Sequence, residues 1–393
     1  MRAPTRLLLV LVAGVVLIVG AIVWRQAAPG GSLAKPREVT VRVVSALPAE
    51  PWVSAAAKAY NGENHSVDGA KVTVEVVPMD GVTALNRWAK NDFDAIPTVW
   101  LAETRDWVNQ ANNLVVESRG QDIFLAGGEY RDQPVALSPE VWAIFKSRFD
   151  ALQAKYAKEL GGRDLSWQQI HAAAVSPDWV SLGGKAEWGR FKLVIPHPKR
   201  DPAGLAAMVG AAGAYYNRAG VTTEDLTNPK FQAWLQEMLD SVVDFSPFGV
   251  ENMLLFGYSN GDAGQIIESY LLVNMEGLQK RWKEPLVILY PDPITWFDFP
   301  YAIYMGKETT ALEKNSALDF KRYLLSDEVQ QTTLRFGLRP ASPNVPAKGD
   351  GSLIARWAEM GFKEEVPSAS RMRPAPRSGL TSLTEWFQGR YER

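Results

Sequence analysis

Few side chains in this 393-residue sequence have the type and spacing that enzymes use for chemistry. The three histidines, His65, His171 and His197, lie far apart, and none has a histidine partner four residues away, as in a zinc-binding helix. Cysteine is absent, which excludes a thiol nucleophile, disulfides, thiolate metal ligands and a lipid attached to cysteine. We therefore expect no catalytic residue, no metal site and no cofactor.

The motifs of nucleotide chemistry are also missing. No Gly-rich loop ends in Lys-Ser or Lys-Thr, and G-x-G-x-x-G does not occur. One string, Gly257-Tyr-Ser259-Asn-Gly261, fits G-x-S-x-G by spacing alone. Adjacent acids such as Glu224-Asp225 and Glu364-Glu365 point in different directions on a helix, which disfavours a glycosidase-like carboxylate pair. An α/β chain of this length without a reactive constellation favours a binding protein over an enzyme.

An uncharged apolar run, Leu7–Trp24, stands near the start of the sequence. Its length approaches the roughly 20 residues that span a bilayer, which favours an uncleaved membrane anchor within residues 1–25. A cleaved secretory signal is the alternative, with Val19-Gly20-Ala21 as a small-residue site inside the run. Basic residues before the run outnumber those after it, so the rest of the chain should lie outside the cytoplasm, membrane-bound or secreted. Residues 26–37 are typical of a flexible linker.

The composition of the exported part narrows its partners. Beyond residues 1–25 the chain carries 39 basic and 44 acidic residues, a formal charge of −5. This mild acidity argues against nucleic acid or an anionic membrane surface as a partner. Fourteen tryptophans are many, and most should be core residues, although aromatic side chains also serve binding clefts.

Strand and helix patterns alternate three times after the linker. Such alternation indicates parallel βαβ units and therefore an α/β domain. The expected strands are Val39–Ser45, Lys71–Pro78 and Ile96–Leu101, and the expected helices are Trp52–Tyr60, Val82–Lys90 and Thr104–Asn112, the last capped by Thr104.

The second half opens at a break, Ser138-Pro139, and is richer in helices. The clearest helix is Lys230–Asp244, whose apolar stripe predicts that Trp234 and Met238 lie in the core. Further strands are expected at Val141–Phe145, Lys192–Ile195, Leu286–Tyr290 and Ala302–Met305, and further helices at Ala317–Leu325, Val329–Phe336 and, after Pro367–Arg377, in a short amphipathic end.

A ligand of an open α/β sheet sits beyond the carboxyl ends of its strands. The first strand ends at Ser45, the third ends near Trp100, and the crossover reaches Ser138, so we expect these side chains to face a ligand. An ordinary turn or cap is the alternative role of each serine.

Two later segments offer further contacts. Asp201 to Gly204 precede an alanine-rich helix whose backbone N–H groups suit an anion or a carbonyl, with capping by Asp201 as the alternative. Glu268-Ser269 follows a glycine-containing turn and offers an acceptor and a hydroxyl, unless it belongs to a solvated helix face.

The order of these segments resembles the extracellular solute-binding proteins of bacterial ABC transporters, which have the two-lobed type 2 periplasmic binding fold. The resemblance covers most of residues 39–345. It is carried in order by VRVVSALPAEPWVSAAAKAYN, FDAIPTVWLAETRDWVNQAN, VALSPEVWAIFKSR, LSWQQIHAAA, WGRFKLVIPHPKRDPAGLAAM, IIESYLL, LVILYPDPITWFDFPYAIY and ALDFKRYLLSDEVQQTTLRFGLRPA.

The resemblance implies crossings between lobes near Ser138 and Pro291–Asp298. Residues 39–137 plus 299–393 would form lobe one, and residues 138–298 would form lobe two. Relatives of this subgroup often carry a hydroxyl residue at the position of Ala203, so that contact is lost or changed here.

Some relatives continue into a von Willebrand A domain, whose metal site needs Asp-x-Ser-x-Ser. The nearest string here is Asp244-Phe-Ser246-Pro-Phe248, and we expect no such fused domain.

The sequence thus predicts an extracytoplasmic receptor that is not an enzyme. It would close over a small polar solute and deliver it to the permease of an ABC importer, with its N-terminal helix in the membrane. A ligand-sensing ectodomain, an exported hydrolase and a scaffold without ligand are the alternatives. The expected ligand contacts are Ser45, Trp100, Ser138, Asp201, Gly204 and Glu268.

Overall fold

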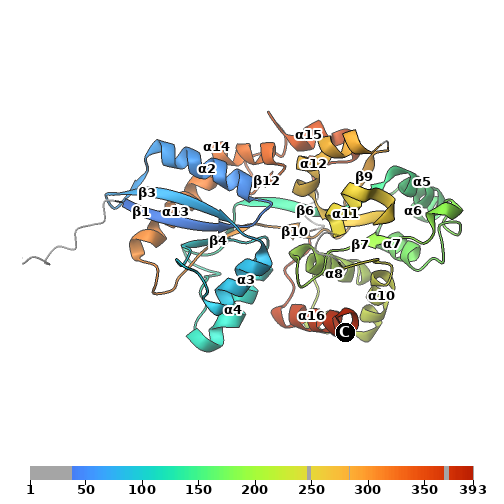
Figure 1. The fold of residues 1–393 in the computed structure, drawn as a ribbon, viewed down its shortest axis with the longest axis horizontal. Coiled ribbons are helices and arrows are strands. Elements are labelled where there is room, and N and C mark those ends of the chain that lie inside the picture. The colour runs from blue at the N-terminus through green and yellow to red at the C-terminus, as the bar shows by residue number, and fades with distance from the viewer. Residues whose placement is uncertain (1–37, 246–248, 283, 367–370, 393) are drawn as a thin grey trace, which may run out of the picture.

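Two β-sheets placed end to end organise the chain into two lobes (Figure 1). The computed structural model describes residues 38–392 apart from 246–248, 283 and 367–370. The apolar run Leu7–Trp24 and the string residues Ser246 and Phe248 lie outside the described residues. Among the helices that are described, none is both long and apolar enough to cross a membrane.

The first sheet contains the predicted parallel strands. Its order is β2-β3-β1-β4-β11-β5, and β1 pairs in parallel with both β3 and β4, whereas β11 runs antiparallel to β4. The alternation of EVTVRVVS in β1 places Val41 and Val43 on one face and Val44 on the other, which is why both faces are covered by helices. The strands are β1 (Glu38–Ser45), β2 (Ser66–Val67), β3 (Ala70–Pro78), β4 (Val99–Leu101), β5 (Gln133–Pro134) and β11 (Pro300–Ile303).

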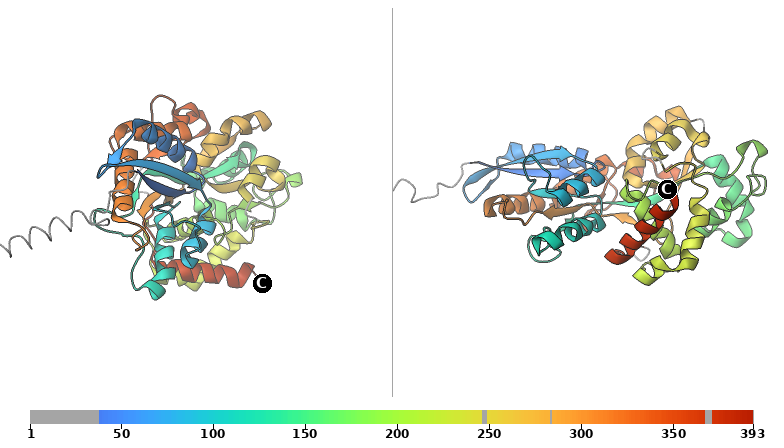
Figure 2. Two further views of the ribbon diagram at one scale, coloured as in Figure 1. Left: turned by 60° about the vertical axis from the view of Figure 1, so that its left-hand side comes forward. Right: turned by 60° about the horizontal axis from the view of Figure 1, so that its bottom comes forward.

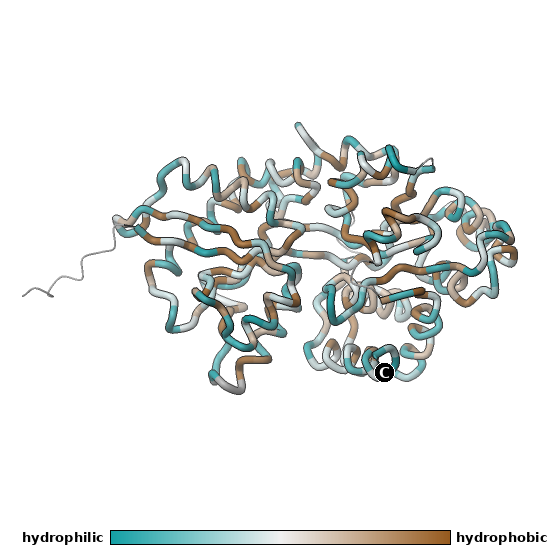
Figure 3. Tube along the Cα trace, in the orientation of Figure 1, coloured by the Kyte–Doolittle hydropathy of each residue, from teal (hydrophilic) through white to brown (hydrophobic). Residues whose placement is uncertain are grey.

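Helices pack on both faces of this sheet. Trp52 and Tyr60 of α2 join Phe320 of α13 in the core on one face, and Trp88 of α3 joins Trp107 of α4 in the core on the other. Hydrophilic and hydrophobic stretches alternate along the trace of the molecule (Figure 3), and Leu114 and Val116 of α4 are exposed. The helices are α2 (Glu50–Glu63), α3 (Gly81–Lys90), α4 (Arg105–Arg119), α13 (Ala311–Leu324), α14 (Asp327–Thr332) and the 3-10 turn η3 (Thr333–Phe336).

The second sheet is built around the long strand β6, which passes from one lobe to the other (Figure 1). β6 pairs with β12 and β10 near its start, and with β8 and β9 along the rest of its length. Its strands are β6 (Ala136–Phe145), β7 (Leu193–Val194), β8 (Ala263–Ile267), β9 (Leu286–Leu289), β10 (Trp296–Phe297) and β12 (Arg339–Pro340).

Helices surround the second sheet, and their apolar residues form two cores. Alanine-rich α8 is buried along almost its whole length. The helices are α5 (Lys146–Lys155), α6 (Ala157–Leu160), α7 (Trp167–Ala174), α8 (Pro202–Tyr215), α9 (Thr223–Thr227), α10 (Pro229–Leu239), α11 (Gly249–Phe256), α12 (Glu268–Arg281), α15 (Leu353–Arg356) and α16 (Arg377–Tyr391), with the 3-10 turns η1 (Ala186–Trp188), η2 (Gly257–Ser259) and η4 (Ala358–Met360).

Three details of the predicted elements differ from the structure. Ser138-Pro139 is not a break but lies inside β6, where the two residues form both pairs with β10. The missing N–H of proline is tolerated there because β8 takes over the pairing from Glu140 onward. Trp234 is only partly buried, because it stacks on His171 at the rim of the core, whereas Met238 is fully buried. Thr104 occupies the cap position of α4 without a side-chain bond.

The last residues of the chain pack on the second sheet's side of the molecule. Leu380, Leu383 and Phe387 of α16 join the same core as α7, α8 and α10, and α16 lies beside α9 (Figure 2). The sequence grouped residues 299–393 as a whole with lobe one. The apolar residues of α16 join the core of the second sheet's side, and α16 contacts both α9 on that side and α4 beside the first sheet.

Candidate ligand-binding site between the lobes

A cavity of about 190 Å³ lies between the two lobes. Lobe one contributes the segments that follow the carboxyl ends of β1, β3 and β4. The second sheet's side contributes the segment after β7, the end of β8, the first residues of α8, and residues of α11 and α12. The lining residues are Leu47, Pro48, Asp80, Gly81, Glu103, Pro196, Arg200, Asp201, Pro202, Ala203, Val250, Glu251, Gln265, Ile266, Ile267 and Tyr270.

The amino ends of two helices meet at this cavity, and each is capped by an aspartate. Asp80 caps α3 by accepting a hydrogen bond from the Thr83 N–H at 2.9 Å. Asp201 caps α8 by accepting one from the Ala203 N–H at 2.8 Å, and Pro202 stands at the first helical position. The positive ends of both helices are therefore already matched by carboxylates of the chain.

Glu103 is the most deeply buried acid in the lining. Its side chain is 5% exposed, and its Oε2 atom has no hydrogen-bond partner. Burial raises the pKa of Glu103 to about 8, backbone N–H groups of Glu103 and Gly81 oppose that rise, and Asp201 and Asp80 add to it. A Cβ atom at Gly81 would lie 2.5 Å from Glu103 Oε2, so only glycine lets this carboxyl group pack there.

Acids of lobe two face Glu103 across the cavity. The pKa of Asp201 is raised to about 6, mainly by burial, with the Ala203 N–H opposing and Glu251 adding to the rise. Tyr270 hydrogen-bonds Glu251, and burial together with that carboxylate raises the pKa of the phenol to about 12. The cavity is thus lined by carboxyl groups from both lobes.

A further buried acid stands behind Gln265. Glu140 is fully buried, and burial raises its pKa well above the usual value, with Asp201 adding to the rise. With its amide nitrogen turned toward this acid, Gln265 donates to Glu140 Oε2 at 3.0 Å, while its oxygen accepts from Trp142. Oε1 of Glu140 has no partner.

The first-lobe residues expected at the site are packed into the structure instead. Ser45 is fully buried and donates to the Ala46 carbonyl. Trp100 is also fully buried, and it packs against Trp88 and Phe124 in the core beneath α3 and α4. Its side chain points to the face of β4 that α3 and α4 cover, because alternate residues of a strand face opposite sides.

Ser138 and Glu268 hold the second sheet together. Ser138 Oγ accepts a hydrogen bond from the Ser269 N–H at 3.0 Å and so caps the start of α12. Glu268 is fully buried and pairs with Arg339, at 2.6 Å to Nε and 2.8 Å to Nη2, and it accepts from the Tyr290 hydroxyl. Both side chains make contacts within the protein, and neither lines the cavity.

Asp201 lines the cavity as the sequence suggested, and Gly204 stands just behind it. A Cβ atom at Gly204 would lie 2.1 Å from the Pro196 carbonyl oxygen and 2.7 Å from the Pro198 nitrogen. The glycine thus lets α8 approach the segment after β7, which brings Pro196 and Asp201 to the same cavity.

Replacing Gly204 with alanine should therefore lower the free energy of unfolding by about 1–3 kcal/mol, because backbone atoms must move to admit the methyl group. Urea unfolding measures this. The matched control is Gly277→Ala in α12, where nothing lies within 4 Å of the added atom and better helix propensity should stabilise the protein by up to about 1 kcal/mol. Equal effects of the two substitutions would contradict the close approach.

Sequence reasoning missed Asp80, Glu103, Glu251 and Tyr270. The signal for the first two was present, because Asp80 and Glu103 follow β3 and β4 directly at their carboxyl ends. Glu251 and Tyr270 come from helices whose orientation toward the cleft depends on tertiary packing, and no local pattern marks them.

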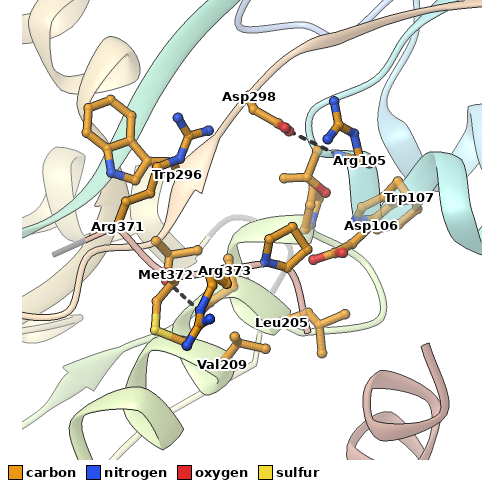
Figure 4. Close-up of a pocket in the computed structure, with 15 residues that line it drawn as sticks. Arg105, Asp106, Trp107, Leu205, Val209, Trp296, Asp298, Arg371, Met372 and Arg373 are labelled. Atoms are coloured by element: carbon orange, nitrogen blue, oxygen red, sulfur yellow. Dashed lines mark hydrogen bonds between the residues drawn. The ribbon is translucent and has the colours of Figure 1, made fainter. Parts of the chain in front are cut away.

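Pro202 also lines a smaller cavity of about 70 Å³. Figure 4 shows residues that line this smaller cavity. Arg371 packs 5.4 Å from the Trp296 ring centroid, and the Arg105 N–H donates to Asp298 Oδ1 at 3.0 Å. Asp106 is partly buried there, and its buried Oδ1 atom has no hydrogen-bond partner. The pKa of Asp106 is raised to about 7 by desolvation and by Asp298, against the charge of Arg105. The lining of the smaller cavity combines acids with arginines, whereas acids predominate in the lining of the larger cavity.

The fold is shared with solved solute-binding proteins. A sulfate-binding protein from Mycobacterium tuberculosis H37Rv matches with a TM-score of 0.53 and 14% identity, over 88% of this chain and 96% of the other. An ABC transporter structure from Clostridium perfringens matches with a TM-score of 0.56 and 12% identity, over 90% of this chain and 99% of the other. A ferric binding protein from Campylobacter jejuni matches with a TM-score of 0.54 and 11% identity, over 90% of this chain and 98% of the other.

Comparison with curated protein sequences gives no match. A family model described as "bacterial extracellular solute-binding protein" matches residues 41–339, most of the chain and all of the segments that line the larger cavity. The solved structures confirm the α/β, two-lobed architecture of periplasmic binding proteins. By this match the chain belongs to the bacterial extracellular solute-binding protein family.

Proposed function

We propose that the protein captures a small polar solute in the cavity between its lobes and delivers it to the permease of an ABC importer. The observation that carries this proposal is the cavity itself, which is formed where strand ends and helix amino ends of both lobes converge. Similar architectures bind sulfate in one structural relative and ferric ion in another. The solute-binding family supports an extracytoplasmic location.

The lobe boundaries are part of this proposal. The sequence places residues 39–137 and 299–393 in lobe one and residues 138–298 in lobe two. The packing of α15 and α16 favours grouping residues 353–391 with lobe two. Closure would then bend the chain near Ser138 and near Pro291–Asp298, where β6 and β10 pair between the lobes.

Attachment to the membrane is proposed from sequence alone. Leu7–Trp24 would anchor the chain beside its permease, with residues 26–37 as the tether and the binding lobes outside the cytoplasm. Cleavage of this segment would instead give a secreted receptor.

Thermal unfolding of the full chain against sugars, amino acids, peptides, polyamines and oxyanions tests the proposed function. A ligand at about 1,000 times its dissociation constant should stabilise the native state by roughly 4 kcal/mol. At about 2 °C per kcal/mol for a chain of this size, the midpoint should rise by several degrees. No shift with any class would contradict solute capture, and turnover of a ligand would favour a hydrolase.

A further inference from the structure

The larger cavity carries an excess of carboxyl groups. Four acids line it, Asp80 and Glu103 from lobe one and Asp201 and Glu251 from the other side. Among the described lining residues the basic side chain is Arg200, which is exposed and whose charge also acts on Glu392 beyond α16. A ligand enclosed here therefore meets a negative field.

The helix ends at the cavity disfavour an anionic ligand. Oxyanions bind at helix amino ends because free N–H groups and the helix dipole attract them. Here Asp80 and Asp201 accept hydrogen bonds from the first turns of α3 and α8, and their carboxylates occupy the position that an oxyanion would take. A bound anion would face both aspartates.

An unpartnered acceptor independently indicates a donor ligand. Glu103 is 5% exposed, lines the cavity and has no hydrogen-bond partner at Oε2. Leaving a buried acceptor unpaired costs about 1–3 kcal/mol, more for a charged group. An ammonium group supplies three N–H donors and a positive charge that would pair with this carboxylate.

The apolar residues of the lining indicate which chemical group the ligand carries beside its positive charge. Leu47, Val250 and Ile266 give the cavity an apolar wall. Within the described residues no group of three or more histidine, cysteine, aspartate or glutamate side chains has the geometry to hold a metal ion. We propose that the bound solute is a small organic cation, an ammonium group on an apolar stem, held by Glu103 and the facing acids Asp201 and Glu251; this inference rests on the proposed solute capture.

Binding of such a cation should be coupled to proton release. Glu103, with a pKa of about 8, faces Asp80 of the α3 cap, Asp201 of the α8 cap and the N–H groups of Gly81 and Glu103. Only its ionised form attracts the cation. The apparent affinity should therefore rise up to about tenfold per pH unit as the pH approaches 8, and level off above it.

Isothermal titration calorimetry of the full chain tests the inference with matched probes. Butylammonium and 1,4-diaminobutane carry the proposed charge, while n-butanol and butyrate keep the stem and replace the charge; sulfate and Ca²⁺ alone complete the set. We expect the two ammonium probes to bind and the others not to bind. Titration at pH 6.5 and pH 8.5 should show tighter binding at the higher pH.

Two substitutions locate the charge. Glu103→Gln keeps the shape of the side chain and should weaken ammonium binding roughly 10- to 100-fold and remove its pH dependence. Asp201→Asn keeps the helix cap, because asparagine caps as well as aspartate, and should also weaken binding. Asp106→Asn is the matched control, because Asp106 lines the smaller cavity and also has an unpartnered buried oxygen, and this substitution should leave binding unchanged.

The outcomes separate this inference from the proposed function. Binding of butyrate, sulfate, n-butanol or Ca²⁺ in place of the ammonium probes would overturn the organic cation. So would loss of ammonium binding in Asp106→Asn but not in Glu103→Gln. If the ammonium probes fail while a sugar or an oxyanion shifts the unfolding midpoint, solute capture stands and the cation does not. If every class fails, both are contradicted.

Discussion

Replacing Arg339 with methionine should destabilise the protein by about 3–5 kcal/mol, as expected when one partner of a buried ion pair is removed. Arg339 is 4% exposed and holds both carboxylate oxygens of the fully buried Glu268. It also donates to the carbonyls of Lys363 and Glu364, at 2.5 Å and 2.9 Å. Its loss leaves a buried carboxylate with the Tyr290 hydroxyl as its remaining donor in the network.

Urea unfolding at neutral pH measures this loss. Arg322→Met is the control, because Arg322 and Glu129 form an ion pair that is 64% and 59% exposed and should contribute less than about 1 kcal/mol. Adding Glu268→Gln to Arg339→Met should recover part of the stability, since the uncompensated charge is then removed. Equal losses for Arg339→Met and Arg322→Met would show that the buried pair has no special role.

Replacing Glu103 with glutamine should stabilise the ligand-free protein at high pH. The pKa of Glu103 is about 8 when folded against 4.5 for an ordinary glutamate, so its ionisation imposes no penalty on the folded state below about pH 4.5. The penalty grows as the pH rises and is complete above about pH 8. At 1.36 kcal/mol per pKa unit it amounts to roughly 3–5 kcal/mol, which glutamine avoids because it stays neutral.

Urea unfolding of wild type and Glu103→Gln at pH 5 and pH 9 checks this sign. The advantage of the variant should be small at pH 5 and large at pH 9. Glu75→Gln, at an exposed pair with Arg42, should change stability by less than about 1 kcal/mol at both values. A stability difference that is the same at pH 5 and pH 9 would contradict the burial of an ionisable Glu103. Stability given up at a binding site is a common cost of function.

The elements of lobe one could be predicted because their patterns are local. The alternation in β1 and the apolar spacing of α2 and α3 were visible in the sequence. The observed bounds of these three elements differ from the predicted ones by a few residues. Ser138-Pro139 was misinterpreted because proline usually ends a strand, and only the change of partner along β6 permits it there.

The candidate site was predictable in place but not in residues. The rule that ligands lie beyond strand ends led to β1 and β4, yet the lining acid is Glu103, two residues past β4, rather than the core residue Trp100. Asp201 was recognised because helix caps have a local signature. Glu268 was misjudged because its partner Arg339 lies 71 residues away in the sequence. Burial and long-range pairing are tertiary properties that no local pattern reveals.

Hydrogen exchange of the full chain, with and without the probe that gives the largest thermal shift, tests most directly whether a solute is held between the lobes. Enclosure predicts slower exchange on both sides of the cavity, at Gly81 and Glu103 and at Asp201, Ala203 and Glu251. Protection confined to one lobe, or centred on Asp106 and Arg371 at the smaller cavity, would contradict capture between the lobes.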